Sequence, residues 1–366
     1  MIFYFDKEYS FYELFNENNG TLVRSNVLCN GVETCVYPDM RSFPELLDVG
    51  IMGNCHAANM GICSASGVDC YQNAPINRRS NMSLKDYLSI INQCKNKTFQ
   101  IALGGAGDPN KHENFEEILI ETTNARIVPN LTTSGYMITE HEIELMRKYC
   151  GAVAVSFYSK LDKNKVETNP LTIDIINKLI SAGCVTNIHY VVSKSNIDEA
   201  IFRLKNNLFP KGANAIVFLL YKPVGMASKN NTISVYDEKY LEFLKVVESK
   251  NNDYKIGFDS CQSPALTLFT DAISQKSIEF CEASRFSMYI DSHLKAFPCS
   301  FGIYNKEFEV DLNQYSIKEA WESEQFDLFR LRQTNGCADC TIENCRTCGI
   351  DLGIKLCNKS NTRIFE

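Results

Sequence analysis

The sequence predicts an α/β fold in which parallel strands alternate with helices, followed by a loop-rich segment that metal centres hold together. Two observations support this prediction. From residue 46 to residue 249, apolar runs of strand length alternate with longer segments that have helical spacing of apolar residues. Beyond residue 254 long apolar runs become rare and cysteines accumulate, which is typical of a segment that needs staples for stability.

The composition is that of an ordinary globular protein. The chain has 366 residues, 45% hydrophobic and 22% charged, enough for one large domain and a smaller one. A formal charge of −7 without a long basic run argues against nucleic acid or an anionic membrane surface as a partner. Residues 1–12 do not resemble a signal peptide, and no apolar run approaches the roughly 18 residues of a membrane span. We therefore expect a cytoplasmic protein.

The predicted elements follow one another in a regular order. Residues 1–45 are expected to form a strand pair or extension, residues 46–250 the core domain and residues 251–366 a cysteine-rich domain. Strands separated by helices of about ten residues form βαβ units, and at least six such strands give a parallel sheet or partial barrel. The core strands are expected at 46–52, 98–103, 125–131, 152–157, 185–192 and 213–221, and the helices at 83–94, 115–122, 140–149, 173–182, 197–206 and 237–249.

Sixteen cysteines are the unusual feature of the composition. Cytosolic thiols stay reduced, so metal binding explains them better than disulfides do. They gather in two groups, one between residues 55 and 70 and one beyond residue 260. The scattered remainder is expected to pack as small buried side chains: Cys29, Cys35, Cys94, Cys150 and Cys184.

The first group consists of Cys55, Cys63 and Cys70 in a loop rich in Gly, Ser and Asn, directly after the first core strand. The carboxyl ends of parallel strands are where α/β folds keep their chemistry. Three thiolates suit a soft metal centre and leave one metal position open. A zinc site and three unrelated thiols are the alternatives.

The next strands also end in residues suited to ligand binding. Gly104, Gly105 and Asp108 lie in the string GGAGDP, where glycines allow a ligand to approach the backbone and the carboxylate suits an amino group. A tight strand-to-helix turn is the alternative explanation. Hydroxyls follow in TTSG, which contains Thr133, and in VAVS, which ends at Ser156.

Together, these four strand ends resemble the radical S-adenosylmethionine enzymes over roughly residues 46–225. In that family three cysteines hold a [4Fe–4S] cluster whose open iron binds S-adenosylmethionine, and reductive cleavage gives a 5′-deoxyadenosyl radical. The resemblance implies a partial (β/α)6 barrel similar to a TIM barrel, with Cys55, Cys63 and Cys70 as cluster ligands. It further assigns Gly104, Gly105 and Asp108 to the methionine end of the cofactor, Thr133 and Ser156 to its ribose or carboxylate, and Val191 to its adenine.

The cysteine loop differs in spacing from the family pattern C-x3-C-x2-C, because its gaps are seven and six residues. Asp108 also stands where that family usually has Glu. Loop closure costs only about 0.6 kcal/mol per doubling of length, so longer loops still bring three thiolates together.

The carboxyl-terminal third contains the string C-x2-C-x4-C-x2-C-x8-C, a helix around Trp321, Phe326 and Phe329, and an expected hairpin at residues 291–299. Residues 259–357 resemble the SPASM extension, which carries two auxiliary iron–sulfur clusters. The resemblance implies Cys261, Cys281, Cys299 and Cys348 as ligands of the first cluster, and Cys337, Cys340, Cys345 and Cys357 as ligands of the second. Zinc remains an alternative, because paired C-x2-C is also a zinc signature.

The resemblance implies a function as well. We expect an oxidoreductase that abstracts hydrogen from a ribosomally made peptide, a RiPP maturase, to form a crosslink, thioether or oxidised side chain. A flavodoxin or ferredoxin would be its reductant. The alternatives are the same chemistry on a protein, as in sulfatase maturation, or on a small metabolite, and a non-catalytic zinc or iron–sulfur scaffold.

Four residues are candidates for handling a proton or radical near the substrate: His189, Tyr190, Lys222 and Asp259. Alternation along a strand does not tell which of His189 and Tyr190 faces inward. His56 adjoins Cys55 and is expected to be an exposed loop residue rather than a ligand.

Overall fold

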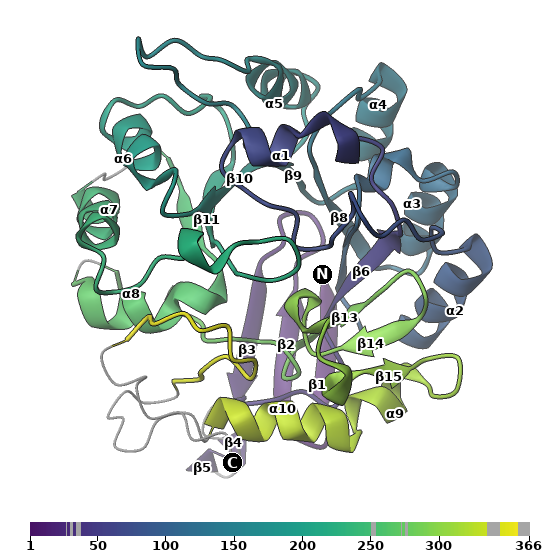
Figure 1. Cartoon of the computed structure of the whole chain (residues 1–366). Helices are drawn as coiled ribbons and strands as arrows, with labels where there is room; N and C mark the ends of the chain where they lie inside the picture. The colour runs from purple at the N-terminus through teal and green to yellow at the C-terminus, as the bar shows by residue number, and fades with distance from the viewer. Residues whose placement is uncertain are drawn as a thin grey trace.

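The computed structural model describes residues 1–26, 28–29, 32–33, 38–249, 254–271, 273–274, 277–334 and 345–357. These residues form a mixed α/β fold on a ten-stranded sheet of order β12-β11-β10-β9-β8-β7-β6-β13-β14-β15. Pairing is parallel from β12 to β13 and antiparallel among the last three strands. The sheet curves, and its helices lie on the outside of the curve (Figure 1).

The core elements lie within three residues of their expected ends. The strands are β6 (Leu46–Met52), β7 (Gln100–Gly105), β8 (Val128–Thr133), β9 (Val153–Ser156), β10 (Thr186–Val192) and β11 (Ala215–Leu220). The helices are α2 (Leu84–Cys94), α3 (Phe115–Asn124), α4 (Glu140–Tyr149), α5 (Leu171–Ser181), α6 (Ile197–Lys205) and α7 (Glu238–Ser249). β6 and α4 begin and end at the residues expected from the sequence.

Side-chain caps fix where two of these helices begin. The Ser83 hydroxyl accepts a hydrogen bond from the Asp86 amide at the start of α2. Thr139 and Glu142 form a reciprocal capping box at the start of α4. These caps fix the first residue of α2 and of α4. The strand-end loops that precede the two helices therefore remain outside them.

The two faces of the curved sheet have different chemistry. On β10, Ile188, Tyr190 and Val192 are buried on the helix side, whereas His189 and Val191 are half-buried on the inner face. Successive strand residues point to opposite faces, so the same alternation places polar residues of other strands on the inner face. They include Asp48 of β6 and Asn130 of β8.

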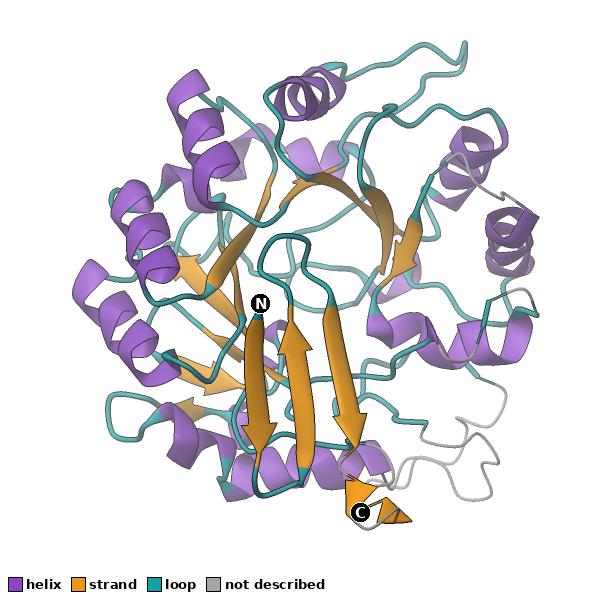
Figure 2. Ribbon diagram, turned by 180° about the vertical axis from the view of Figure 1, so that it is seen from behind, coloured by secondary structure: helices purple, strands orange, loops and turns teal. Residues whose placement is uncertain are grey.

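An amino-terminal sheet closes one end of the fold. It contains β1 (Ile2–Asp6), β2 (Phe11–Phe15) and β3 (Leu22–Asn26), one strand more than the expected pair, and a small ladder joins β4 (Leu28–Cys29) to β5 (Val32–Glu33). Phe15 stacks on Phe99, just before β7, with ring centroids 5.2 Å apart. Arg24 binds Glu45, just before β6, at 2.5 Å. The sheet therefore covers the end at which the parallel strands begin (Figure 2).

The large sheet crosses the boundary expected near residue 250. β12 (Ile256–Phe258) pairs with β11, and β13 (Ser287–Ile290) pairs with β6 in parallel. β12 is only three residues long, too short for a periodicity argument to detect. The hairpin of β13 and β14 (Lys295–Phe297) begins four residues before its expected start. Asp291 belongs to its turn, where its carboxylate accepts hydrogen bonds from the amides of His293 and Lys295, so the first strand ends before Asp291.

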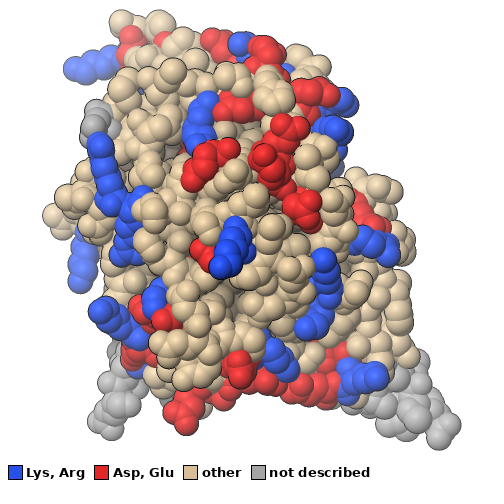
Figure 3. Space-filling model, turned by 90° about the vertical axis from the view of Figure 1, so that its right-hand side faces the viewer, with Lys and Arg blue, Asp and Glu red and all other residues tan. Residues whose placement is uncertain are grey.

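The remaining α-helices and strands of the described residues are α1 (Ile62–Ala65), α8 (Ser263–Phe269), β15 (Val310–Asp311), α9 (Ile317–Trp321) and α10 (Glu324–Thr334). Within the described residues, no helix combines the length and apolar character needed to cross a membrane. On the side of the molecule that carries α2 and α3, acidic and basic side chains lie among one another (Figure 3).

Trp321 anchors the carboxyl-terminal helices. It is 1% exposed, and its indole N–H donates to the Arg41 carbonyl at 2.8 Å. We expect Trp321→Ala to lower the free energy of unfolding by about 3–5 kcal/mol, the range for removing a large buried ring. Trp321→Phe retains most of the ring but loses the hydrogen bond, so its loss should be about 1–2 kcal/mol. Urea unfolding followed by circular dichroism measures both, and equal losses would contradict this account.

Candidate functional site

The loop that follows β6 is held over the carboxyl ends of several strands. The Gly53 amide donates to the Asn81 side chain at 3.1 Å, and Asn54 donates to the Arg79 carbonyl at 3.3 Å. Farther along the loop, the Gly67 carbonyl accepts a hydrogen bond from Asn231 at 3.1 Å. These bonds tie both the beginning and the middle of the loop to the strand-end edge of the sheet.

Cys55, Cys63 and Cys70 come together in this loop. All three are half-buried. Burial raises the pKa of Cys55 to about 11, and negative charge on Asp108, Cys63 or Cys70 raises it further. Burial also raises the pKa of Cys63, whose thiol donates to the Tyr158 hydroxyl at 3.3 Å. The three sulfur atoms are therefore close enough to repel one another when ionised.

The glycine-rich turn after β7 lies directly against the cysteine loop. The Ala106 amide donates to the Met52 carbonyl at 2.8 Å. A Cβ on Gly107 would lie 2.3 Å from the Asn54 carbonyl oxygen and 3.0 Å from the Cα of Cys55. Gly105 has a φ of +115°, a conformation that L side chains rarely adopt. Only glycines allow this close approach, so the turn and the loop form one surface.

Asp108 provides a carboxylate at this surface. It accepts hydrogen bonds from the Ser134 amide at 2.7 Å and the Ser134 hydroxyl at 2.5 Å, and His56 Nε2 lies 3.8 Å away. Burial raises the pKa of Asp108, and the Ser134 hydrogen bonds oppose that rise. The carboxylate is thus held in place beside the thiols, and an added cation would favour its charged form.

The other predicted cofactor residues lie on neighbouring strands with different orientations. Thr133 is 1% exposed, and its hydroxyl donates to Asn110 at 2.9 Å, so this group is already used inside the fold. Ser156 and Val191 are half-buried at the ends of β9 and β10. Gly104 faces Asp48, whose carboxylate would lie 3.8 Å from an added Cβ.

Of the four catalytic candidates, Tyr190 lies on the wrong face. Its ring packs against Phe157, Phe209 and Phe218 between the sheet and the helices, and its hydroxyl donates to the Asn196 carbonyl at 3.3 Å. His189 is on the opposite, inner face. The sequence left this choice open because both residues belong to one alternating strand.

The sequence patterns did not predict a polar cluster around Asp48 on the inner face. Burial raises the pKa of Asp48 to about 7, and Asp48 in turn raises the pKa values of Tyr71 and Tyr289. Gln72 donates to the Tyr289 hydroxyl at 3.4 Å. A carboxylate within the apolar run LLDVGIM was the signal that could have revealed Asp48.

Four cysteines of the carboxyl-terminal third form the second group: Cys261, Cys281, Cys299 and Cys348. Each is half-buried, and burial raises the pKa of Cys261, Cys281 and Cys299. Each of these three thiols is also affected by the charge of Cys348. Cys261 and Cys348, nearly ninety positions apart in the sequence, are therefore neighbours.

Lys222 and Asp259 form an ion pair beside this second group. The Lys222 ammonium lies 2.5 Å from Asp259 Oδ2 and 4.4 Å from the centre of the Phe301 ring. Burial alone would lower the pKa of Lys222, but Asp259 and the thiolate charges of Cys261 and Cys299 raise it. Lys222 therefore remains a cation that offsets negative charge at the second group.

Only part of the predicted second auxiliary ligand set belongs to the described residues. Cys337 and Cys340 lie outside the described residues, whereas Cys345 and Cys357 are described and half-buried. Among the described residues, no three His, Cys, Asp or Glu side chains converge closely enough to hold a single metal ion.

The donor chemistry of both groups fits iron–sulfur clusters. Such clusters are held by cysteine thiolates, and both groups supply cysteine thiols. Burial raises the pKa of Cys55 and Cys63 and so opposes their ionisation. A bound metal centre would favour the thiolate forms, since it lowers thiol pKa values and adds positive charge.

Comparison with solved structures gives the same fold. SuiB from Streptococcus suis bound to S-adenosylmethionine matches with a TM-score of 0.60 and 18% identity, over 78% of this chain and 67% of SuiB. SuiB bound to precursor peptide SuiA matches with a TM-score of 0.62 and 15% identity, over 88% of this chain and 87% of SuiB. AnSMEcpe with bound AdoMet and Cp18Cys peptide matches with a TM-score of 0.56 and 15% identity, over 78% of this chain and 81% of anSMEcpe.

These likenesses show the fold that the chain shares with SuiB and anSMEcpe. No family model matches the chain, and no curated protein matches its sequence.

His189 makes a testable contribution to acid stability. Burial lowers its pKa to about 4, with Asp259 acting in the opposite direction. The folded state therefore binds a proton less readily than the unfolded chain, and stability is lost as the pH falls from 6.5 towards 4. The loss is at most about 3 kcal/mol. We expect His189→Gln to flatten the dependence of unfolding free energy on pH in this window.

The exposed His293 offers a matched control, because His293→Gln should leave the pH dependence as in wild type. Urea unfolding at a series of pH values measures all three proteins. An unchanged slope in His189→Gln would show that His189 is not the acid-sensitive group.

Proposed function

We propose that the chain is a radical S-adenosylmethionine enzyme that modifies a peptide. Its fold would be a partial (β/α)6 barrel with a SPASM-like extension. One observation supports the proposal: Cys55, Cys63 and Cys70 lie in one loop beside Asp108, near enough for the charge of one group to act on another. When bound there, a [4Fe–4S] cluster with S-adenosylmethionine supplies the radical that removes a hydrogen atom from the substrate.

The chain's own residues would divide the remaining tasks. Cys55, Cys63 and Cys70 would hold the cluster, and Asp108 would orient the amino group of S-adenosylmethionine through a charge-assisted hydrogen bond. Gly104 and Gly105 would leave room at the turn for the methionine end, and Ser156 and Val191, at the ends of β9 and β10, would contact its ribose and adenine. Thr133 would act indirectly, since its hydroxyl is used by Asn110.

The second thiol group supports the extended version of the proposal. Cys261, Cys281, Cys299 and Cys348 would hold an auxiliary cluster, and Cys337, Cys340, Cys345 and Cys357 another. The segments that carry the two thiol groups touch each other, because the centroids of the Tyr71 and Phe301 rings lie 4.9 Å apart. Tyr71 follows Cys70, and Phe301 lies two residues after Cys299. Substrate bound on the inner face would thus lie between the two groups.

A peptide is the substrate that we favour. SuiB and anSMEcpe, which share this fold, have been solved with bound peptides. The inner face offers Asp48, Asn130 and His189, which suit hydrogen bonds to amide groups. A crosslink, a thioether or an oxidised side chain would be the product, and a flavodoxin or ferredoxin the reductant. A zinc or iron–sulfur scaffold would have no use for Asp108 or for this polar inner face.

The first experiment removes the three loop cysteines. After anaerobic reconstitution with iron and sulfide, dithionite and S-adenosylmethionine are added and 5′-deoxyadenosine is quantified. Wild type should form it, and the Cys55→Ala/Cys63→Ala/Cys70→Ala variant should fall to background because no site remains for the cluster. Cys184→Ala, a half-buried thiol outside both groups, is the control and should retain activity. Equal 5′-deoxyadenosine from the triple variant would contradict the proposal.

The second experiment tests Asp108. Asp108→Asn removes the charge that would pair with the amino group, and hydrogen bonds to charged groups contribute about 1.5–3 kcal/mol. Binding of S-adenosylmethionine should therefore weaken by about ten- to a hundredfold. Glu144→Gln is a suitable control, because this exposed carboxylate lies on α4 and binds Arg147. Unchanged affinity in Asp108→Asn, measured by equilibrium dialysis, would remove Asp108 from the cofactor site.

A further inference from the structure

The three-stranded amino-terminal sheet exposes one side that is almost entirely apolar. Its outward positions form two rows across the strands, one with Phe3, Leu14 and Val23 and the other with Phe5, Tyr12 and Ser25. We call these six residues the apolar face. The ring centroids of Phe3 and Phe5 lie 5.2 Å and 4.8 Å from that of Tyr12, so the two rows are continuous. In Figure 2 the sheet lies in front of the other described elements.

The charged residues of this sheet lie on its buried side instead of its exposed side. Asp6 and Glu13 are fully buried, and Asp6 accepts a hydrogen bond from the Ser42 hydroxyl at 2.8 Å. Arg24 binds Glu45 at 2.5 Å on the same side. An antiparallel sheet with one face in water normally places its polar residues on that face. The apolar face therefore has the composition of a surface that is buried in an assembly.

The apolar face also has the size of an interaction surface. Phe3 is 60% and Val23 49% exposed, and Phe5, Tyr12 and Leu14 are each 36–40% exposed. Because an aromatic side chain presents roughly 150–250 Å² and an aliphatic one somewhat less, these fractions amount to about 400 Å². Apolar patches of roughly 300–600 Å² often mark interaction sites. Two such faces in contact would remove about 800 Å² from water, in the range of weak, reversible complexes.

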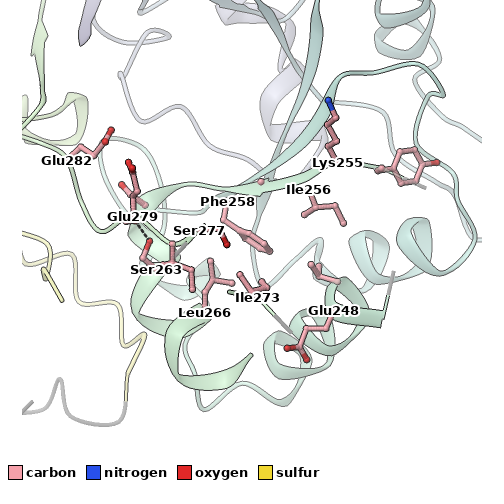
Figure 4. Close-up of a pocket in the computed structure, with 15 residues that line it drawn as sticks. Glu248, Lys255, Ile256, Phe258, Ser263, Leu266, Ile273, Ser277, Glu279 and Glu282 are labelled. Carbon is pink, nitrogen blue, oxygen red and sulfur yellow. Dashed lines mark hydrogen bonds between the residues drawn. The ribbon is translucent and has the colours of Figure 1, made fainter. Parts of the chain in front are cut away.

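The chemistry of the apolar face favours a partner of the same kind. The cavity of about 900 Å³ beside β12 and α8 is a contrast, because Lys255, Glu248 and Glu279 lie among its apolar side chains (Figure 4). A face without charges offers no electrostatic complement to a charged partner. It fits best against another uncharged, apolar sheet face, and a second copy of this chain supplies one.

The position of the sheet suits contact between copies. It covers the end of the fold at which the parallel strands begin (Figure 2). Cys55, Cys63 and Asp108 belong to loops at the opposite ends of these strands. A copy bound to the apolar face therefore leaves the candidate site of each chain uncovered. Twofold contacts between identical surfaces are also the commonest form of protein assembly.

We propose that the apolar faces of two copies of this chain pack against each other in a twofold dimer. The two sheets would stack at the spacing of a β-sandwich, about 10 Å, with the rows of aromatic and aliphatic side chains between them. The area predicts a reversible dimer with a micromolar Kd. The proposal does not depend on the proposed function, since the apolar face lies away from the candidate site.

Sedimentation equilibrium of the reconstituted full chain in sealed anaerobic cells tests the dimer. Wild type should shift from monomer to dimer through the micromolar range, and added salt should not weaken the dimer because no charged pair holds it. Leu14→Lys places a charge in the middle of the face and should raise the Kd more than about tenfold, since the contact would desolvate that charge. Wild type that stays monomeric at high micromolar concentration would overturn the proposal.

Leu208→Lys is the matched control. Leu208 is 39% exposed, against 40% for Leu14, and lies outside the sheet, after α6. Its Kd should equal that of wild type. If the two lysine variants weaken the dimer equally, or if neither weakens it, the copies meet through another surface and the proposal is wrong.

A second variant covers the case in which Leu14→Lys does not fold. Phe3→Thr changes an exposed ring on the edge strand β1 to a residue that favours strands, so circular dichroism should remain native. Loss of the ring should raise the Kd about tenfold. Tyr236→Thr, at a position 59% exposed before α7, is its control and should dimerise as wild type. An unchanged Kd in Phe3→Thr would exclude the aromatic rows from the contact and contradict the proposal.

Discussion

The placement of three half-buried thiols beside a buried carboxylate is the constraint on which the site depends. Cys55, Cys63, Cys70 and Asp108 come from two strand-end loops that only glycines allow to touch. The Ser134 hydrogen bonds, His56 and Lys111 all favour the charged form of Asp108. The loop is anchored at several points, so the three thiols stay in one loop at the strand-end edge.

The curved sheet explains how distant groups serve one site. Its helix side is apolar, and its inner face carries Asp48, Asn130 and His189. β13 pairs with β6, and this pairing brings the carboxyl-terminal cysteines to the strand that precedes the first cysteine loop. The Tyr71–Phe301 contact then joins the segments that carry the two thiol groups.

Much of this organisation was predictable from the sequence, and the failures have physical causes. Long periodic segments such as α4 and β6 were located to the residue, because burial of one face dictates their pattern. β12 was not predicted because three residues are too few to show an alternating pattern of apolar and polar side chains. The choice between His189 and Tyr190 stayed open because alternation fixes which residues share a face but not which face is inward. Asp48 was overlooked because its strand was interpreted only as buried.

The most direct test of the account is an electron paramagnetic resonance measurement on the reconstituted, dithionite-reduced protein, with and without S-adenosylmethionine. The account predicts a signal from a reduced [4Fe–4S] cluster that S-adenosylmethionine changes, since the cofactor binds its open iron. In the Cys55→Ala/Cys63→Ala/Cys70→Ala variant the cofactor-sensitive component should be missing, while signals from the other cysteine group remain. A spectrum that S-adenosylmethionine leaves unchanged in wild type, together with stoichiometric zinc, would contradict the central claim.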